Sequence, residues 1–186
     1  MIKSTNTARI YPSPFIQNMK QYAIKAHADC NQMYDEYIDY QFHLRMVVKN
    51  GENFIHLIPD VEKDNAIAGC WGHDLIEDTR ENYNAVKSQS NVEVAEIVRC
   101  CTNYGRGRNR DERMPDWLYE EIKANPSATF VKLCDRMANA QYSKMTGSQM
   151  YDKYIKEHAH FKKMLYTPGY LEEMWKNLEE IFGINN

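Results

Sequence analysis

The chain has 186 residues, a formal net charge of −3, and 43% hydrophobic and 26% charged residues. Its length corresponds to about one domain of roughly 100–200 residues, and its composition excludes a disordered chain because it is that of a typical globular protein. The acidic balance argues against a nucleic-acid-binding protein, since such domains are usually strongly basic.

Apolar residues at helical spacing predict helices in nine segments. The first begins at Ser13-Pro14, where a serine cap precedes a proline, and the second ends at Asn50-Gly51, a helix-stop signal. The third is apolar nearly all round, which is typical of a central, buried helix. The segments are 14–30, 39–48, 64–76, 81–88, 92–102, 115–124, 127–145, 151–165 and 170–182.

Strands are not predicted, because no segment alternates with the period of two that a half-buried strand shows. No linker or internal repeat divides the chain. We therefore predict an all-α protein that forms one domain over residues 1–186, with seven to nine helices. The C-terminal helix, residues 170–182, is expected to pack on the rest of this domain.

The five cysteines are odd in number and form no C-x-x-C pair, which favours free thiols in a reducing compartment. No apolar run approaches the ~20 residues of a membrane helix, and the first residues lack the apolar core of a signal peptide. We expect a cytoplasmic protein that binds neither membranes nor nucleic acids. These patterns leave the oligomeric state open.

A cluster of ionisable residues, His73-Asp-Leu-Ile-Glu-Asp78, ends the predicted buried helix. Four such groups in six residues are costly to bury unless they pair or bind a cation. Helical spacing of four places His73 with Glu77, and Asp74 with Asp78, on shared faces. The alternative interpretation of this segment is a solvated, acidic helix end.

Two further polar residues lie in predicted apolar helices. His43, taken alone, is compatible with a core histidine. Asp135 needs a positive partner, either an arginine such as Arg136 or a metal ion, because aspartate is rarely buried unpaired. Together with His73 and Asp74 they supply two imidazoles and two carboxylates, a set that suits Mn²⁺, Fe²⁺ or Zn²⁺ better than Ca²⁺ or Mg²⁺.

The order of these four residues resembles the HD superfamily of metal-dependent phosphohydrolases. The segment His73-Asp-Leu-Ile-Glu-Asp-Thr79 is similar to the HDxxEDT signature of the RelA/SpoT hydrolase domain and of the small alarmone hydrolases. Other segments in the family's order are Ala26-His27, Tyr40-x-x-His43, Val94-Ala-Glu-Ile-Val98 with Thr102, and Val131-Lys-Leu-x-Asp-Arg-x-x-Asn139. The resemblance spans about residues 20–165 and implies an HD-type helical domain.

The resemblance also implies roles for individual residues. One divalent cation, typically Mn²⁺, would be held with positions left for water and a substrate phosphate. Its ligands would be His43, His73, Asp74 and Asp135. Glu77 and Asp78 would be the catalytic acidic pair, which orients and deprotonates the attacking water or protonates the leaving oxygen. Asn139 would hydrogen-bond the nucleotide.

Residues 29–39 depart from the resemblance, because alarmone hydrolases usually have a basic stretch and a glycine turn here. This chain has four acids and no Lys or Arg in the segment. A predicted loop holds the densest basic cluster, Arg106, Arg108, Arg110 and Arg113. Arg106 and Arg108 are substrate-binding candidates because a guanidinium bonds two phosphate oxygens at once; a solvated basic loop is the alternative. Lys25 is a further substrate-binding candidate.

The function implied is a Mn²⁺-dependent hydrolase that removes the 3′-pyrophosphate from guanosine tetra- or pentaphosphate, a small-molecule nucleotide. The acidic segment keeps open an HD phosphohydrolase for another nucleotide, such as a deoxynucleotide or a nicotinamide dinucleotide phosphate. A cyclic-dinucleotide phosphodiesterase is disfavoured, since Ile76 and Glu77 stand where that group has HDxGK. A third class is a non-catalytic binding module stabilised by metal, against which the acidic pair argues.

Overall fold

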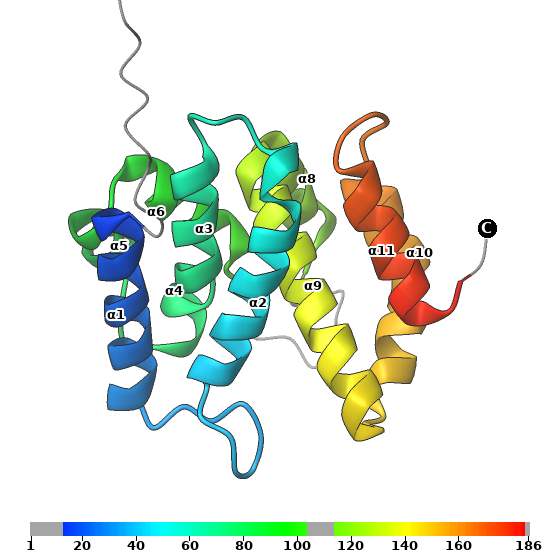
Figure 1. The fold of residues 1–186 in the computed structure, drawn as a ribbon, viewed down its shortest axis with the longest axis horizontal. Helices are drawn as coiled ribbons and strands as arrows, with labels where there is room; N and C mark the ends of the chain where they lie inside the picture. Colours follow the sequence, from blue (N-terminus) through cyan, green and yellow to red (C-terminus); the bar gives the residue numbers. More distant parts are fainter. Residues whose placement is uncertain (1–12, 104–113, 185–186) are drawn as a thin grey trace, which may run out of the picture.

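The computed structural model describes residues 13–103 and 114–184 and confirms the predicted all-α fold (Figure 1). The α-helices of the described residues are α1 (Pro14–Asp29), α2 (Gln41–Phe54), α3 (Lys63–Gly72), α4 (Leu75–Asp78), α5 (Tyr83–Gln89), α6 (Val92–Cys101), α8 (Asp116–Ala124), α9 (Pro126–Thr146), α10 (Met150–Leu165) and α11 (Glu172–Phe182). A 3₁₀ helix, η1 (Ile55–Leu57), follows α2. The β structure in the described ranges is limited to two isolated bridges.

The ends of several helices follow their sequence signals. Ser13 accepts a hydrogen bond from the Ile16 amide (3.4 Å) and precedes the proline that opens α1. Asn125 caps α9 through the Ala128 amide (3.1 Å). The same helix ends at Gly147, whose φ of +69° lies in the left-handed region that glycine adopts at little cost.

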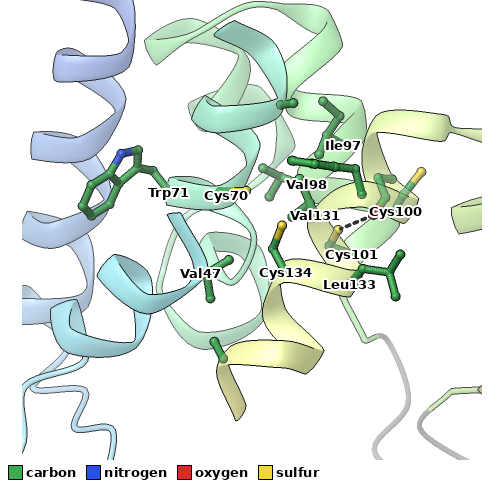
Figure 2. Packing of buried hydrophobic residues seen from close by; sticks show 14 of the residues in the cluster. Val47, Cys70, Trp71, Ile97, Val98, Cys100, Cys101, Val131, Leu133 and Cys134 are labelled. Carbon is green, nitrogen blue, oxygen red and sulfur yellow. Dashed lines mark hydrogen bonds between the residues drawn. The ribbon is translucent and has the colours of Figure 1, made fainter. Parts of the chain in front are cut away.

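Helix α3 is the central element of the core, as its apolar sequence predicted. All residues from Ala66 to Gly72 are buried, and α3 contacts α1, α2, α6 and α9. A Cβ atom at Gly72 would lie 2.3 Å from Met19 Cε, and one at Gly69 would lie 2.7 Å from Ile97 Cγ2. The two glycines therefore let α1 and α6 approach α3 closely. Figure 2 shows side chains of α3, α6 and α9 packed in this core.

The helix stop predicted at Asn50-Gly51 is wrong, because α2 continues to Phe54. A Cβ atom at Gly51 would lie 3.1 Å from both Cys70 Sγ and Ile67 Cδ1 of α3. The glycine thus serves the close packing of two helices, and this tertiary contact outweighs its local preference for a helix end.

The predicted helix 64–76 is interrupted. Helix α3 ends at Gly72, and after a turn at His73-Asp74 the chain resumes as the single turn α4. Glycine is a poor helix former, which favours a helix end at Gly72. Gly72 also lies close to Met19 of α1, so α3 ends deep in the core. The consequence is that the His-Asp pair lies in a turn between two helices rather than on a helix face.

The C-terminal helix α11 contacts α9, and its Trp175 ring lies 5.8 Å from that of Phe161 on α10. All five cysteines are free thiols, as expected. Within the described ranges, no helix combines the length and the apolar character that crossing a membrane requires.

Candidate metal centre

Four polar side chains from three parts of the chain converge below the surface. We call them the ligand set: His43 on α2, His73 and Asp74 in the α3–α4 turn, and Asp135 on α9. The two imidazole Nε2 atoms are 3.2 Å apart. Asp74 Oδ2 lies 2.8 Å from His73 Nε2, and Asp135 Oδ1 lies 3.4 Å from His43 Nε2. Ligand atoms of both histidines and Asp135 fall within 4.8 Å of one another.

The electrostatics of the ligand set favour a positive charge among these atoms. Burial alone would lower the pKa of His43, but hydrogen bonds and charges from the two aspartates outweigh it and raise this pKa to about 9. The pKa of His73 is also raised, because Asp74 outweighs burial. The pKa values of both carboxyls fall despite burial, since His73 stabilises the charge of Asp74 and Lys132 that of Asp135.

The ligand set fits a divalent cation. His73 Nδ1 donates to the carbonyl oxygen of Cys70 (3.0 Å), which leaves Nε2 as the lone-pair nitrogen facing the other ligands. Two imidazole nitrogens and two carboxylates form a mixed set that suits Mn²⁺, Fe²⁺ or Zn²⁺. Because imidazole binds metal only when neutral, a bound cation would displace the protons that the raised histidine pKa values favour.

The ligand set borders an open cavity of about 180 Å³. This volume is below the 300–1,000 Å³ that small-molecule sites usually occupy, so a nucleotide bound here would extend beyond the mouth of the cavity. Glu77 and Asp78 of α4 line this cavity. Glu77 accepts hydrogen bonds from the backbone amide and the side-chain amide of Asn103, both at 2.9 Å. Burial, followed by the nearby charge of Asp74, raises the pKa of Asp78 to about 6.

The substrate-binding candidates differ in where they lie. Asn139 lines the cavity and donates to Asp135 Oδ1 (2.5 Å). Lys25 does not line it: this exposed side chain of α1 forms an ion pair with Asp29. Arg106 and Arg108 lie outside the described residues, together with the rest of their loop.

Sequence reasoning missed Lys132 as a cavity residue. Its ammonium is buried, 3.5 Å from Asp135 Oδ2 and 3.3 Å from the carbonyl oxygen of Cys101. Lys132 is thus a cationic partner of Asp135, whereas the guanidinium of Arg136 reaches Glu157 at 3.1 Å. A lysine in an apolar helix, three residues before a buried aspartate, is the signal that could have identified it.

Two tyrosines and an amide of the cavity wall were also missed. Tyr34 and Tyr40, from the segment between α1 and α2, line the cavity, as does Asn103 after α6. Tyr40 falls in the segment Tyr40-x-x-His43 that resembles the family, but no role was inferred for it; nothing in the local sequence marked Tyr34 or Asn103. These three residues line the cavity because segments that are distant in the sequence come together in the folded protein.

No protein-family model matches the chain, and no curated protein matches it. Among solved structures it is similar to a metazoan protein described as an ortholog of SpoT that hydrolyses ppGpp and plays a role in starvation responses. The match has 24% sequence identity and a TM-score of 0.74, and it covers 94% of this chain and 99% of that one. The two chains share one fold. The fold expected from the resemblance to the RelA/SpoT hydrolase domain is therefore confirmed.

Proposed function

We propose that this protein is a Mn²⁺-dependent hydrolase of guanosine tetra- or pentaphosphate, which releases pyrophosphate and leaves GDP or GTP. The observation that carries the proposal is the convergence of the ligand set beside a pair of carboxylates in one cavity. The fold shared with a protein that hydrolyses ppGpp supports the choice of substrate. We also propose a cytoplasmic location, which the free thiols support.

All four residues of the ligand set would hold the cation. When bound, a divalent cation favours ionisation of the attacking water and offsets the negative charge of the phosphate. Asp74 and Asp135 would contribute carboxylate oxygens, and the two histidines their Nε2 atoms. The side chains need little rearrangement for this, because these atoms already face one another.

The proposed role of Asp78 is to transfer a proton. The pKa of its carboxyl group is about 6, so the group is mostly ionised at pH 7. Because this pKa lies close to pH 7, the group can both accept and release a proton. The water oxygen attacks the phosphorus next to the ribose 3′ oxygen, and the carboxylate takes the proton of that water. As the bond from phosphorus to the 3′ oxygen breaks, the same proton passes to the 3′ oxygen.

Glu77 is proposed to orient the attacking water. Two hydrogen bonds from Asn103 restrict this carboxylate to one orientation, and a fixed acceptor can direct a water molecule toward phosphorus. Asn139 is proposed to bind the nucleotide: one N–H of its side chain donates to Asp135, and the other would donate to the substrate.

The net charge of the cavity lining limits the number of phosphate groups that a bound substrate can carry. Its described lining contains four carboxylates and two basic side chains, Lys132 and Arg136. A divalent cation would bring this lining close to neutral. A guanosine tetraphosphate therefore needs further positive charge, which we propose comes from Arg106 and Arg108.

A second candidate is an HD phosphohydrolase for another, less charged nucleotide. It is favoured by the segment between α1 and α2, which contributes tyrosines to the described lining but no Lys or Arg. A non-catalytic, metal-stabilised binding module is less well supported. A purely structural metal site has no need of Glu77 and Asp78 beside it.

The test is incubation of the purified protein with ppGpp, a deoxynucleoside triphosphate and a nicotinamide dinucleotide phosphate, each with and without Mn²⁺. Anion-exchange chromatography resolves GDP, pyrophosphate and orthophosphate. We expect the protein to form GDP and pyrophosphate from ppGpp only when Mn²⁺ is present. Faster turnover of another nucleotide would select the second candidate, and no turnover of any of them would favour the binding module.

A further inference from the structure

Two tyrosines of the α1–α2 loop (residues 30–40) reach the carboxylates of the ligand set. Tyr40 donates its hydroxyl hydrogen directly to Asp74 Oδ2. Tyr34 donates to Asn139 Oδ1 (2.9 Å), and Asn139 Nδ2 donates to Asp135 Oδ1 (2.5 Å). We propose that this loop is a positioning element of the metal centre, with Tyr40 and Tyr34 as its positioning residues. The inference rests on the metal site of the proposed function.

Tyr40 is held in a fixed place. It is 9% exposed, and the imidazole of His27 stacks on its ring with a centroid distance of 4.3 Å and an interplanar angle of 18°. The oxygen that accepts its hydroxyl, Asp74 Oδ2, is the one that lies 2.8 Å from His73 Nε2. Tyr40 therefore restrains the carboxylate oxygen that faces the imidazoles of the ligand set.

Tyr34 acts on the opposite pair of ligands. Its ring stacks on the His43 imidazole at 4.7 Å and 20°. Metal-binding histidines usually donate their second ring N–H to an acceptor, but His43 Nδ1 is buried and has no hydrogen-bond partner among the described residues. The His43 imidazole is oriented instead by ring contacts with Tyr34 and with Tyr40, whose ring centroid lies 5.4 Å from that of His43.

The loop itself is tied down at its tip. The Tyr34 amide donates to the carbonyl oxygen of Ile38 (2.8 Å), and the Tyr142 hydroxyl of α9 donates to the Asp35 carboxylate. This use of Asp35 gives the acidic composition of the loop a structural role. The loop does not supply charge to the described cavity; it carries two hydroxyl groups and two rings to the ligand set.

Loss of either hydroxyl should weaken metal binding. Side chains that orient metal ligands typically change metal affinity by 10–100-fold when they are replaced. Tyr40 bonds a ligand directly, so its loss should have the larger effect. Tyr34 acts through Asn139, and its ring contact with His43 survives replacement by phenylalanine, so its hydroxyl should contribute less.

The experiment is calorimetric titration of Mn²⁺ into the metal-free, full-length protein. We expect the Kd for Mn²⁺ to rise at least about tenfold in Tyr40→Phe, the lower end of the range for residues that orient metal ligands. In Tyr34→Phe we expect a rise of about fivefold, below that range, because this hydroxyl acts through Asn139. The matched control is Tyr37→Phe, because Tyr37 belongs to the same loop and is 81% exposed. Its Kd should equal that of the wild type.

Thermal melting with and without Mn²⁺ separates positioning from plain stability. A positioning role predicts that the increase in Tm caused by Mn²⁺ shrinks in Tyr40→Phe, whatever the Tm of the metal-free variant. Wild-type Kd values in both Tyr40→Phe and Tyr34→Phe would overturn the inference while leaving the metal centre intact. A wild-type protein that binds no Mn²⁺ would overturn the proposed metal centre as well.

Discussion

The base of the cavity and its rim are built in different ways. At the base, the ligand set comes from α2, the α3–α4 turn and α9, and these elements pack against one another in the core. At the rim, the α1–α2 loop contributes tyrosines, and Asn103 follows the end of α6. Two packed helices and the short α3–α4 turn hold the metal ligands, whereas the rim adds side chains from a loop and from the end of a helix.

The two regions would set different properties, the class of reaction at the base and the choice of substrate at the rim. A buried aspartate or histidine needs a partner, so the base admits few substitutions and dictates the class of reaction. A rim residue on a loop can change with little effect on folding. The base therefore supports the proposed metal-dependent hydrolysis, and we expect the rim to decide which nucleotide is accepted.

The largest effect is expected at the base. Asp74→Ala and Asp135→Ala should each abolish metal binding and hydrolysis, because each removes a carboxylate ligand and leaves the two histidines with one acidic neighbour instead of two. Metal content after dialysis against Mn²⁺, measured by plasma mass spectrometry, checks this. Full metal content in both variants would show that the ligand set is assigned wrongly.

Glu77→Gln should separate catalysis from binding. The amide keeps the shape of the side chain but loses its negative charge and one of the oxygens that would orient the attacking water, so we expect kcat to fall by about 10²-fold, the usual cost of misplacing a reacting group. The Kd for Mn²⁺ should stay within about threefold of the wild type, because Glu77 bonds Asn103 and not the ligand set. An unchanged kcat with a raised KM would instead make Glu77 a binding residue.

The base was predictable from sequence for a physical reason. His43 and Asp135 are polar residues in apolar helices, and such residues stand out because burying them alone is costly. The interruption at His73-Asp74 was not predictable from spacing, since the contact of Gly72 with Met19 depends on how α1 packs on α3. The all-α fold followed from local periodicity, which survives such breaks.

The rim could not be predicted from sequence in the same way. Tyr34 carries no local signal, and the segment Tyr40-x-x-His43 gave no role for Tyr40. Their hydroxyls donate to Asn139 and Asp74, which are distant in the chain. Lys25 was a candidate because of its charge, but a lysine on a helix surface is usually solvated, and this one pairs with Asp29. Charge alone does not tell which side of a helix faces a cavity.

A moderate effect is expected from the arginine loop. Replacing Arg106 and Arg108 together with alanine should raise the KM for guanosine tetraphosphate at least about tenfold, or about 1.4 kcal/mol. The effect should shrink as salt rises, since screening weakens exposed charge contacts, and it should be smaller for a nucleoside monophosphate. Steady-state kinetics at two ionic strengths measure it. Equal KM values on every substrate would remove these arginines from the site.

The smallest effect concerns stability and lies where base and rim meet, at Asp78. The pKa of this carboxyl is about 6 in the folded protein, raised by burial and then by Asp74, and about 3.9 in an unfolded chain. A raised pKa means that folding favours the protonated form. Its contribution to stability is therefore full below pH 4 and is lost as the pH rises through 6.

Asp78→Asn removes this penalty, so the metal-free variant should be more stable than the wild type at pH 7.5. Because Asp78 is partly exposed, solvent screening reduces the gain to about 1 kcal/mol, which corresponds to a rise in Tm of about 2–4 °C for a chain of this size. The gain should vanish at pH 4, where the wild-type carboxyl is protonated in the folded state. Thermal melts in EDTA at both pH values measure it, with Glu36→Gln, an exposed carboxylate of the α1–α2 loop, as the control.

If Asp78→Asn has the same Tm as the wild type at pH 7.5, the Asp78 carboxylate is fully solvated, and the case for its proton transfer fails. A stabilised variant that no longer hydrolyses ppGpp would show the opposite: this carboxylate is kept for chemistry at a cost to the fold.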